Sequence, residues 1–370
     1  TVPTARIMDR MLHNSVAVMQ TIAKERGVSE YPLYDHEDVG YAMRHTHGRE
    51  FGTPFLLDTP SPVSVRFQYA GHVLGSASVL VQTDAHTLLY TGDICESDQE
   101  LMGGYAPLPD GMPVDTLVIE STHGATDETE VLPYQEEALR LGRCIAEVLD
   151  RGGVALVPSF ALGRTQEMLN VIARLQEESI IPDVPVYASG LGRAIYELYA
   201  RYDHYLGDHA NLRPLEQFGR VGNVWERGVV EELLRRPCII VATSGMMLEN
   251  TPSALIAERM VRETHHGIFF TGYVDHETLG YKVLHARPGD QLRFRLGGRL
   301  ADVRLENIRR FHFSAHAARG TLRRFIERVR PRNVVFVHGD ADALTWMENN
   351  VSNGYRHVTP AIGQTVNLTE

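Results

Sequence analysis

The spacing of apolar residues predicts a helix at the start of the chain and a group of strands after it. Residues 4 to 24 carry apolar side chains near helical spacing, which predicts an amphipathic helix: Ile7, Met8, Met11, Leu12, Met19 and Ile22. Short β-rich runs follow, separated by turn residues: "VSVRFQYA", "SVLVQT", "TLLYTGD" and "VDTLVIEST". These runs predict a sheet whose strands follow one another in antiparallel succession.

From about residue 133 the pattern changes to an alternation of helix and strand. Helical runs such as "EEALRLGRCIAEVLDRGG" and "GRTQEMLNVIARLQEE" alternate with apolar runs such as "VALVPSF", "CIIVATSG" and "GIFFTGY". This alternation is typical of βαβ units around a mostly parallel sheet. After residue 290 strands return in "QLRFRL" and "NVVFVHGD". We therefore expect an α/β domain inserted into a first domain whose two parts lie at the chain ends.

Length and composition fit a globular protein of two domains, or of one domain with a large insertion, with 370 residues, 43% hydrophobic and 22% charged. No run approaches 18 apolar residues and no signal-like segment opens the chain, so we expect neither a membrane segment nor secretion. The three cysteines form no CxxC pair, which favours a reducing, cytoplasmic compartment. A net charge of -11 argues against coating nucleic acid with the whole surface, but it leaves room for a local basic track.

Three of the seventeen histidines differ from the rest because each ends or follows an apolar strand between small residues. They are His72 in "AGHVLGS", His316 in "FSAHAA" and His338 in "FVHGDA". Imidazole is the commonest protein ligand of zinc, and small neighbours let the backbone turn a ring toward a shared site. Taken singly, each is more often a histidine held by hydrogen bonds at a strand end than a metal ligand. Together with the strand-end carboxylates Asp93 and Glu120, they favour a metal site.

Eight stretches in order carry a likeness to a known family: "AGHVLGSA", "LLYTGDI", "LVIESTHG", "VPSFALGRTQEML", "ATSGMM", "GYVDHETLG", "FHFSAHA" and "VFVHGD". From about residue 1 to 340, the chain closely resembles the β-CASP branch of metallo-β-lactamase-fold nucleases. That branch includes the pre-mRNA 3′-end cleavage endonuclease and its bacterial and archaeal RNase relatives. The resemblance implies an α/β fold, a metallo-β-lactamase αββα sandwich at residues 1–124 and 314–370 with a β-CASP α/β domain inserted at 125–313.

The resemblance also implies roles for five residues. His72 is similar to the third-motif zinc ligand, Asp93 to the aspartate that bridges two zincs, and His338 to the ligand of the last motif. Glu120 and His316 resemble the acidic residue of the first β-CASP motif and the histidine of the second, which implies catalytic roles. Glu120 would hold His316 toward the phosphate or the leaving group, and a structural ion pair is the alternative. Two zinc ions are implied, with a water between them that attacks the phosphodiester in the interdomain cleft.

The family's defining ligand motif, His-x-His-x-Asp-His, does not occur in this sequence. "RHTHGREF" places His45 and His47 at the right spacing, but Arg49 and Glu50 stand where Asp and His should follow. We interpret His45 and His47 as loop histidines. Since the chain begins with Thr1 and the family places the motif upstream of the first helix, we expect the sequence to be N-terminally incomplete. Without the first strands and this motif, the chain alone would hold an incomplete site.

An arginine run predicts a track for the phosphate backbone. Between Arg304 and Arg332 lie nine arginines, including Arg324, against only two glutamates. A basic rim for nucleic acid and a solvated helix face both fit this run, and the two interpretations stay open.

The inserted domain offers further substrate-binding candidates. Arg164 in "FALGRTQE" lies at an expected helix start, where backbone N–H groups favour anions, and by resemblance its loop faces the substrate. Ser244 and Gly245 in "SGMM" are expected to border the same region. Trp225 and Trp346 show no alternation of aromatic and basic residues, so we expect them to be packing residues.

The function implied by the resemblance is a zinc-dependent phosphodiesterase that cleaves RNA, with DNA as the less favoured substrate. The alternative is a catalytically degenerate, nuclease-like scaffold subunit of a processing or defence complex, which the missing motif favours and the five retained residues oppose. A hydrolase of small esters or thioesters on this fold is disfavoured by the inserted domain. We expect nucleic acid as partner, no membrane, and either a homodimer or a subunit of a complex. Endonuclease and exonuclease activity both stay open.

Overall fold

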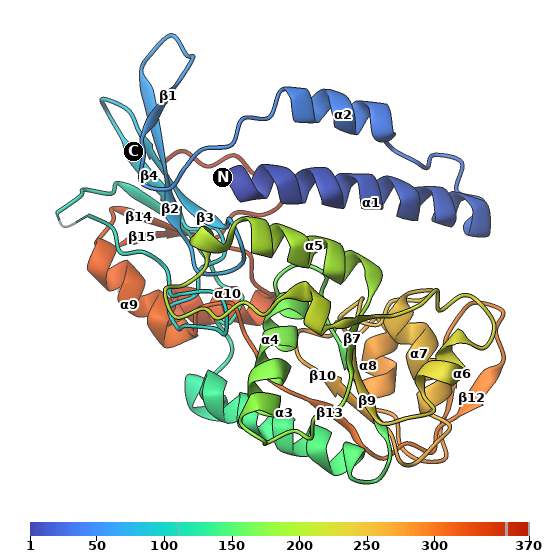
Figure 1. Ribbon diagram of the computed structural model, residues 1–370. Coiled ribbons are helices and arrows are strands. Elements are labelled where there is room, and N and C mark those ends of the chain that lie inside the picture. The colour runs from blue at the N-terminus through green and yellow to red at the C-terminus, as the bar shows by residue number, and fades with distance from the viewer. Residues whose placement is uncertain (110, 352–353, 369–370) are drawn as a thin grey trace. The chain divides into compact units, whose positions relative to one another are not determined.

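The computed structural model describes residues 1–109, 111–351 and 354–368, without the side chains of residues 25 and 26. It divides into two compact units (Figure 1). Unit 1 comprises Thr1–Asp98, Met102–Glu130 and Ala315–Glu370, and unit 2 comprises Gln99–Leu101 and Val131–Ser314. The expected limits of the two family domains, after residues 124 and 313, stay a prediction. None of the helices in the described part of the chain is long and apolar enough to span a membrane.

Unit 1 contains a seven-stranded mixed sheet in the order β1-β2-β3-β4-β5-β14-β15. Its strands are β1 (Phe55–Leu57), β2 (Val63–Tyr69), β3 (Ala77–Gln82), β4 (Thr87–Tyr90), β5 (Thr116–Glu120), β14 (Asn333–Val337) and β15 (Arg356–Val358). The predicted antiparallel succession is confirmed for β2, β3 and β4, and β1, which was not predicted, pairs antiparallel with β2. It is wrong for β4 and β5, which pair in parallel. The 25 residues between these two strands are long enough for the crossover that parallel pairing requires.

One face of this sheet carries a continuous row of buried side chains. Leu80, Leu89, Leu117 and Val334 are paired in register across β3, β4, β5 and β14, and each is fully buried. They form one core with residues of α9 (Arg319–Val329) and α10 (Ala341–Asn350). Burying a leucine or valine side chain contributes about 1.5–3 kcal/mol. This core therefore fixes the register of the parallel strands β4, β5 and β14.

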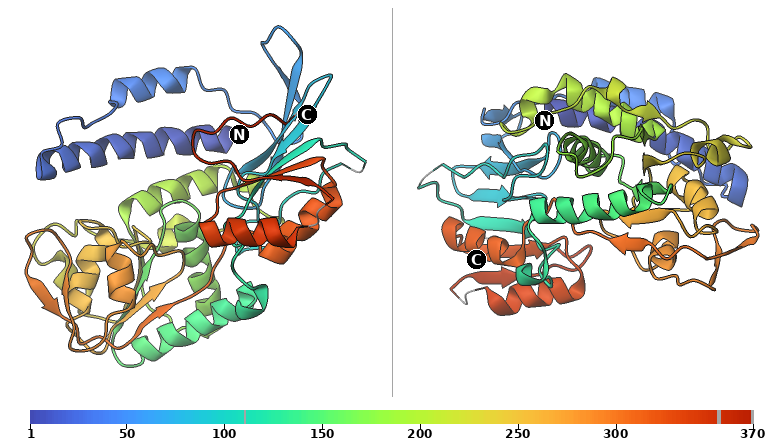
Figure 2. Two further views of the ribbon diagram at one scale, coloured as in Figure 1. Left: turned by 180° about the vertical axis from the view of Figure 1, so that it is seen from behind. Right: turned by 60° about the horizontal axis from the view of Figure 1, so that its bottom comes forward.

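Two helices near the start of the chain pack on each other within unit 1. The predicted helix is confirmed as α1 (Val2–Arg26), which lies beside α2 (His36–Arg44) in Figures 1 and 2. Val16, Met19 and Val39 form a small core between them. Asp35 caps α2 by accepting the backbone N–H groups of Glu37 and Asp38, which satisfies donors that a helix start leaves open.

Unit 2 is a doubly wound α/β domain, as the alternation of helix and strand predicts. Its six strands have the order β13-β10-β6-β9-β7-β8, and all their pairs are parallel. They are β6 (Val154–Pro158), β7 (Val186–Ala188), β8 (Gly219–Arg220), β9 (Cys238–Ala242), β10 (Gly267–Phe270) and β13 (Ile308–Arg310). A separate hairpin joins β11 (Gln291–Arg293) to β12 (Leu300–Asp302).

The helices of unit 2 connect these strands and bury their apolar faces in two cores. They are α3 (Tyr134–Leu149), α4 (Arg164–Glu177), α5 (Gly190–Arg201), α6 (Val229–Leu233), α7 (Pro252–Met260) and α8 (Leu279–Leu284). Strands β6, β9 and β10 are buried at every residue, as expected for parallel strands covered on both faces.

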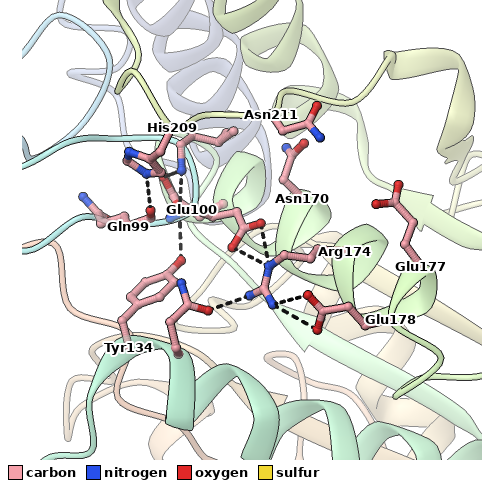
Figure 3. Close-up of polar contacts among 12 residues, drawn as sticks. Gln99, Glu100, Tyr134, Asn170, Arg174, Glu177, Glu178, His209 and Asn211 are labelled. Carbon is pink, nitrogen blue, oxygen red and sulfur yellow. Dashed lines mark hydrogen bonds and ion pairs between the residues drawn. The ribbon is translucent and has the colours of Figure 1, made fainter.

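A polar network holds residues 99–101 within unit 2 (Figure 3). The buried Glu167 carboxylate accepts backbone N–H groups of Glu100 at 2.7 Å and Leu101 at 3.1 Å, and the Tyr134 hydroxyl at 2.9 Å. Arg174 binds the Glu100 carboxylate at 2.9 Å. Burial raises the pKa of Glu167, and the charge of the nearby arginine at the start of α4 opposes that shift. Every acceptor in this network therefore has a donor, which buried polar groups require.

Substituting Gly71 by alanine should destabilise the fold, because this glycine has φ +75° and no room for a side chain. A Cβ atom there would lie 2.6 Å from the Cys95 carbonyl oxygen and 2.8 Å from that of Gly103. We expect Gly71→Ala to lower the free energy of unfolding by roughly 2 kcal/mol or more in denaturant unfolding. Gly52→Ala is the control, since Gly52 has φ +73° but no atom within 4 Å of its Cβ position. Equal losses in the two variants would contradict the close approach.

The stability of the protein should fall with acid through His266. This buried ring accepts the Val154 backbone N–H at 3.0 Å, and burial lowers its pKa to about 4 from an ordinary 6.5. The contribution of the neutral His266 ring to the free energy of unfolding is complete above pH 6.5. It is lost as the pH falls toward 4, which lowers the free energy of unfolding by up to about 3 kcal/mol. We expect His266→Asn to flatten the pH dependence of unfolding between pH 7 and 4. His285→Asn, at an exposed histidine that follows α8, should keep the wild-type slope, and an unchanged slope in both variants would contradict this role.

Candidate metal centre

Three neighbouring parallel strands of unit 1 bring candidate site residues to one edge of the sheet. Asp93 follows β4, Glu120 ends β5 and His338 follows β14. Because β5 pairs in parallel with both β4 and β14, the carboxyl ends of all three strands meet at that edge. His338 has φ +52°, an uncommon conformation for a residue with a side chain and one that clusters at functional sites.

Four side chains come together at this edge. Possible metal-binding atoms of Asp93, Glu120, His316 and His338 all lie within 4.8 Å of one another. His338 Nδ1 is 2.8 Å from Asp93 Oδ1, and His316 Nδ1 is 2.9 Å from Glu120 Oε2. Imidazole nitrogens and carboxylate oxygens are donors that zinc prefers in catalytic sites. The set therefore has the composition of a metal centre.

His72 approaches the same cluster from the turn between β2 and β3. Its Nδ1–H donates to the Ala315 carbonyl oxygen at 2.9 Å, which leaves the lone pair on Nε2. That Nε2 lies 3.7 Å from Asp93 Oδ2, and the ring stacks at a tilt against His316, with 4.6 Å between centroids. Burial, together with the charge of His316, lowers the pKa of His72. The ring is thus held in the neutral form that binds metals.

Glu120 is buried with both carboxylate oxygens occupied. Oε1 accepts the Ile94 backbone N–H at 2.8 Å, and Oε2 accepts the Nδ1–H of His316 at 2.9 Å. Burial raises the pKa of Glu120, but the hydrogen bond and the charge of His316 outweigh burial, so the pKa lies below its ordinary value. The ionised carboxylate fixes the ring plane of His316 and directs its Nε2 away from Glu120.

Two residues that the sequence reasoning did not single out also contact the cluster. Thr122 Oγ1 donates to the His338 carbonyl oxygen at 3.2 Å and lies 3.3 Å from its Nδ1. His123 meets His316 edge to face, with 5.9 Å between the ring centroids. Both belong to the "ESTHG" stretch, where polar residues stand between a strand end and a glycine. That position was the signal that could have identified them.

The other histidine pair lies apart from this group. His45 ends α2, with its Nδ1 2.9 Å from the Tyr41 carbonyl oxygen and its ring stacked on Tyr41. Within the described residues, neither His45 nor His47 belongs to a set of side chains that could hold a metal.

Three of the four substrate-binding candidates lie in unit 2. Arg164 begins α4 and is only 9% exposed. Its charge acts on the buried Glu167, and its guanidinium lies 6.0 Å from the Phe313 ring centroid. Ser244 and Gly245 follow β9, and a Cβ at Gly245 would lie 2.9 Å from the Phe160 ring. Their contact with substrate stays a prediction.

The arginines of α9 are largely paired with acidic residues. Arg324 lies 3.3 Å from Glu96, Arg323 lies 3.5 Å from Glu327, and Arg319 pairs with Asp127. These pairs favour the interpretation of the arginine run as a salt-bridged, solvated helix face. The role of Arg324 in binding substrate stays a prediction with less support.

The two tryptophans differ. Trp346 packs beneath the Arg319 guanidinium, which lies 4.6 Å from its ring. Trp225 is 63% exposed, so its prediction as a packing residue is wrong. The sequence around Trp225 does not reveal this exposure. Whether a tryptophan is buried depends on packing against segments that are distant in the sequence.

Comparisons with known proteins bear on both units. The Beta-Casp domain family matches residues 165–283, and the family described as "Zn-dependent metallo-hydrolase RNA specificity domain" matches residues 300–360. Transcription termination factor FttA of Methanocaldococcus jannaschii is 33% identical over 335 residues, which are 86% of this chain and 51% of that protein. Cleavage and polyadenylation specificity factor subunit 3 of Dictyostelium discoideum is 30% identical over 293 residues, 76% of this chain and 36% of that protein.

A third relative is covered more fully. The RNase J-like protein of Methanocaldococcus jannaschii is 28% identical over 311 residues, 83% of this chain and 70% of that protein. The chain spans about half the length of the two FttA proteins that it matches first, 51% and 49%. Both matched domains and the strand-end cluster point the same way, and the chain belongs to the β-CASP branch of the metallo-β-lactamase-fold nucleases, a family of metal-dependent hydrolases.

Proposed function

We propose that this protein is a zinc-dependent nuclease that hydrolyses the phosphodiester bonds of RNA. The observation that carries the proposal is the position of Asp93 between two histidines. Its Oδ1 lies 2.8 Å from His338 Nδ1, and its Oδ2 lies 3.7 Å from His72 Nε2. One carboxylate that presents a separate oxygen to each of two imidazoles has the arrangement needed to bridge two metal ions. Paired metals are a common basis of phosphodiester hydrolysis.

The donor set fits zinc, and we assign His72, Asp93 and His338 as its ligands. Imidazole nitrogen and carboxylate oxygen suit this metal, and the carbonyl of Ala315 holds His72 in the tautomer that presents Nε2. These three side chains would hold the metal, with Asp93 offering a separate oxygen beside each histidine. Catalytic zinc usually takes three protein ligands, so each ion needs more than these residues supply. The family's His-x-His-x-Asp-His motif, absent from this sequence, is of the type that would complete them.

Bound divalent metal supplies a Lewis acid and a water of lowered pKa. The chain's own contribution is the oriented imidazole of His316. Glu120 accepts its Nδ1–H, and the negative charge of Glu120 favours the imidazolium form. In that form Nε2–H can donate to a phosphate oxygen or give its proton to the leaving oxygen, which returns the ring to the neutral form. Glu120 is buried and doubly hydrogen-bonded, so it acts by positioning His316 and not as a metal ligand.

The choice of RNA as substrate rests on the description of the matched family and on the names of related proteins. The family matched at residues 300–360 is described as an RNA specificity domain, and relatives are named endoribonuclease YSH1 and probable RNase MJ4. We carry RNA over DNA to this protein on that ground. Membership of a larger complex follows in the same way from the relative named as a subunit of a cleavage and polyadenylation factor. We keep a cytoplasmic location on the ground of three free cysteines.

A scaffold function is the second candidate, and the missing ligand motif favours it. A subunit without metal would have no chemical use for a buried carboxylate that orients an imidazole. Metal content therefore separates the two candidates.

Metal binding should depend on Asp93 and His338 but not on Glu120. In the full-length protein we expect about two zinc ions per chain by mass spectrometry, and a loss of at least tenfold in zinc affinity in Asp93→Asn and His338→Ala. Glu120→Gln should keep its zinc, because both Glu120 oxygens bind other groups. His45→Ala is the control for removal of an exposed histidine. Wild-type protein without zinc would establish the scaffold candidate in place of the nuclease.

RNA cleavage should depend on the pair formed by His316 and Glu120. We expect His316→Ala and Glu120→Gln to lower the rate of cleavage of a single-stranded RNA by about 10² to 10⁴, with zinc content unchanged and a cooperative unfolding transition retained. The losses should not add in the double variant, because the two residues act as one unit. Wild-type rates in either single variant would remove this pair from the mechanism.

A further inference from the structure

Unit 2 contains a cavity of about 230 Å³ that lies outside the residues assigned to the metal centre. The segment before α6, α6 itself, α7 and the turn of the β11–β12 hairpin enclose it. Helices α6 and α7 lie side by side in Figure 1. The buried side chains of Val224 and Val230 line the cavity together with Leu255. Its volume is that of several water molecules, which leaves room for one planar group.

Trp225 lines this cavity and is 63% exposed, one of the most exposed large aromatic side chains in the described part of the chain. The segment that carries it is held by local hydrogen bonds. Asn223 Oδ1 accepts the Trp225 backbone N–H at 3.3 Å, and Asn223 Nδ2 donates to Glu226 Oε1 at 2.8 Å. The indole is thus presented on a fixed segment with much of its surface open. An exposed tryptophan beside a cavity is typical of a surface that binds a ligand or a macromolecular partner.

Three guanidinium groups line the same cavity. Arg259 pairs with Glu231 at 3.0 Å, and Arg295 lies 3.4 Å from the nearly buried Glu258. These carboxylates fix two of the arginines. The third, Arg227, has no ion-pair or hydrogen-bond partner for its side chain among the described residues. It is therefore the arginine that an incoming anion can bind without breaking an existing pair.

The lining of the cavity is itself balanced, with three arginines against Glu226, Glu231 and Glu258, whereas the segments that border it are basic in an acidic protein. Segments 219–236 and 287–304, which border it, carry nine arginines against five acidic residues, while the whole chain has a net charge of -11. Local positive charge of this kind attracts a polyanion. A cavity for a protein partner would also use tryptophan and arginine, but it has no need for this local excess of positive charge.

We propose that this cavity binds one nucleotide of a single-stranded RNA, at a second site distinct from the metal centre. The base stacks on the Trp225 indole, and the Arg227 guanidinium binds the adjacent phosphate. Stacking on an aromatic side chain combined with a basic contact to the backbone is how proteins hold single strands without reading their sequence. The inference rests on the proposed function only for the identity of the strand as RNA.

Fluorescence tests this site directly, because the chain has only two tryptophans. In Trp346→Phe, all tryptophan emission comes from Trp225. We expect a ten-nucleotide oligouridylate, added in EDTA to prevent cleavage, to quench this emission in a saturable way that weakens with salt. RNA anisotropy in the wild-type background should show that Trp225→Ala weakens binding by roughly 5- to 100-fold, and that Arg227→Ala also weakens it and lowers the salt slope.

Arg201→Ala is the matched control, since Arg201 is an exposed arginine on α5 that does not line the cavity. It should leave RNA affinity within about twofold of wild type. Absence of quenching by the oligouridylate, or an unchanged RNA affinity in Trp225→Ala, would overturn the proposed nucleotide site. Quenching by a protein partner but not by RNA would also overturn it. The two proposals fail separately: RNA cleavage without quenching removes only this site, whereas quenching without cleavage by the metal-loaded protein removes only the nuclease.

Discussion

The parallel pairing of β4, β5 and β14 is the constraint on which the candidate metal centre depends. Leu89, Leu117 and Val334 lie in register across the three strands and are fully buried, so a slip of one residue would turn them out of the core. The same register brings Asp93 and His338 to one sheet edge although they are far apart in the sequence. The geometry of the site is therefore a consequence of apolar packing several residues away from it.

Two buried glutamates show how the surroundings of a carboxylate determine both its pKa and its structural role. Glu120 is bound by one backbone N–H and by His316, whose hydrogen bond and charge outweigh burial and lower the glutamate's pKa. Glu167 is bound by two backbone N–H groups and a tyrosine hydroxyl, and burial wins, so its pKa is raised. The first carboxylate orients a ring at the candidate site, and the second fixes residues 99–101 in unit 2. Desolvation raises the pKa of both carboxylates, and the hydrogen-bond partners decide whether the net shift is upward or downward.

The number of arginines in a segment does not show how many of them are free to bind an anion. On α9, Arg319, Arg323 and Arg324 all have acidic partners, which neutralise a run that looks strongly basic in the sequence. Near α6, Arg227 stands in a less conspicuous segment and its side chain has no such partner among the described residues. An anion gains most from a guanidinium that it does not have to take from a carboxylate, so a paired run is the weaker candidate for a binding track.

The sequence by itself indicated the candidate site residues and the local structure that holds them. Small residues beside His72 and His338, the helix spacing of α1 and the alternation in unit 2 are local patterns, and local patterns fix local conformation. Only the tertiary structure decided which elements meet. The parallel pairing of β4 with β5, the contacts of Thr122 and His123, the pairing of Arg324 with Glu96 and the exposure of Trp225 each depend on residues distant in sequence. Such partners are selected by packing and charge in three dimensions, which no short stretch of one chain specifies.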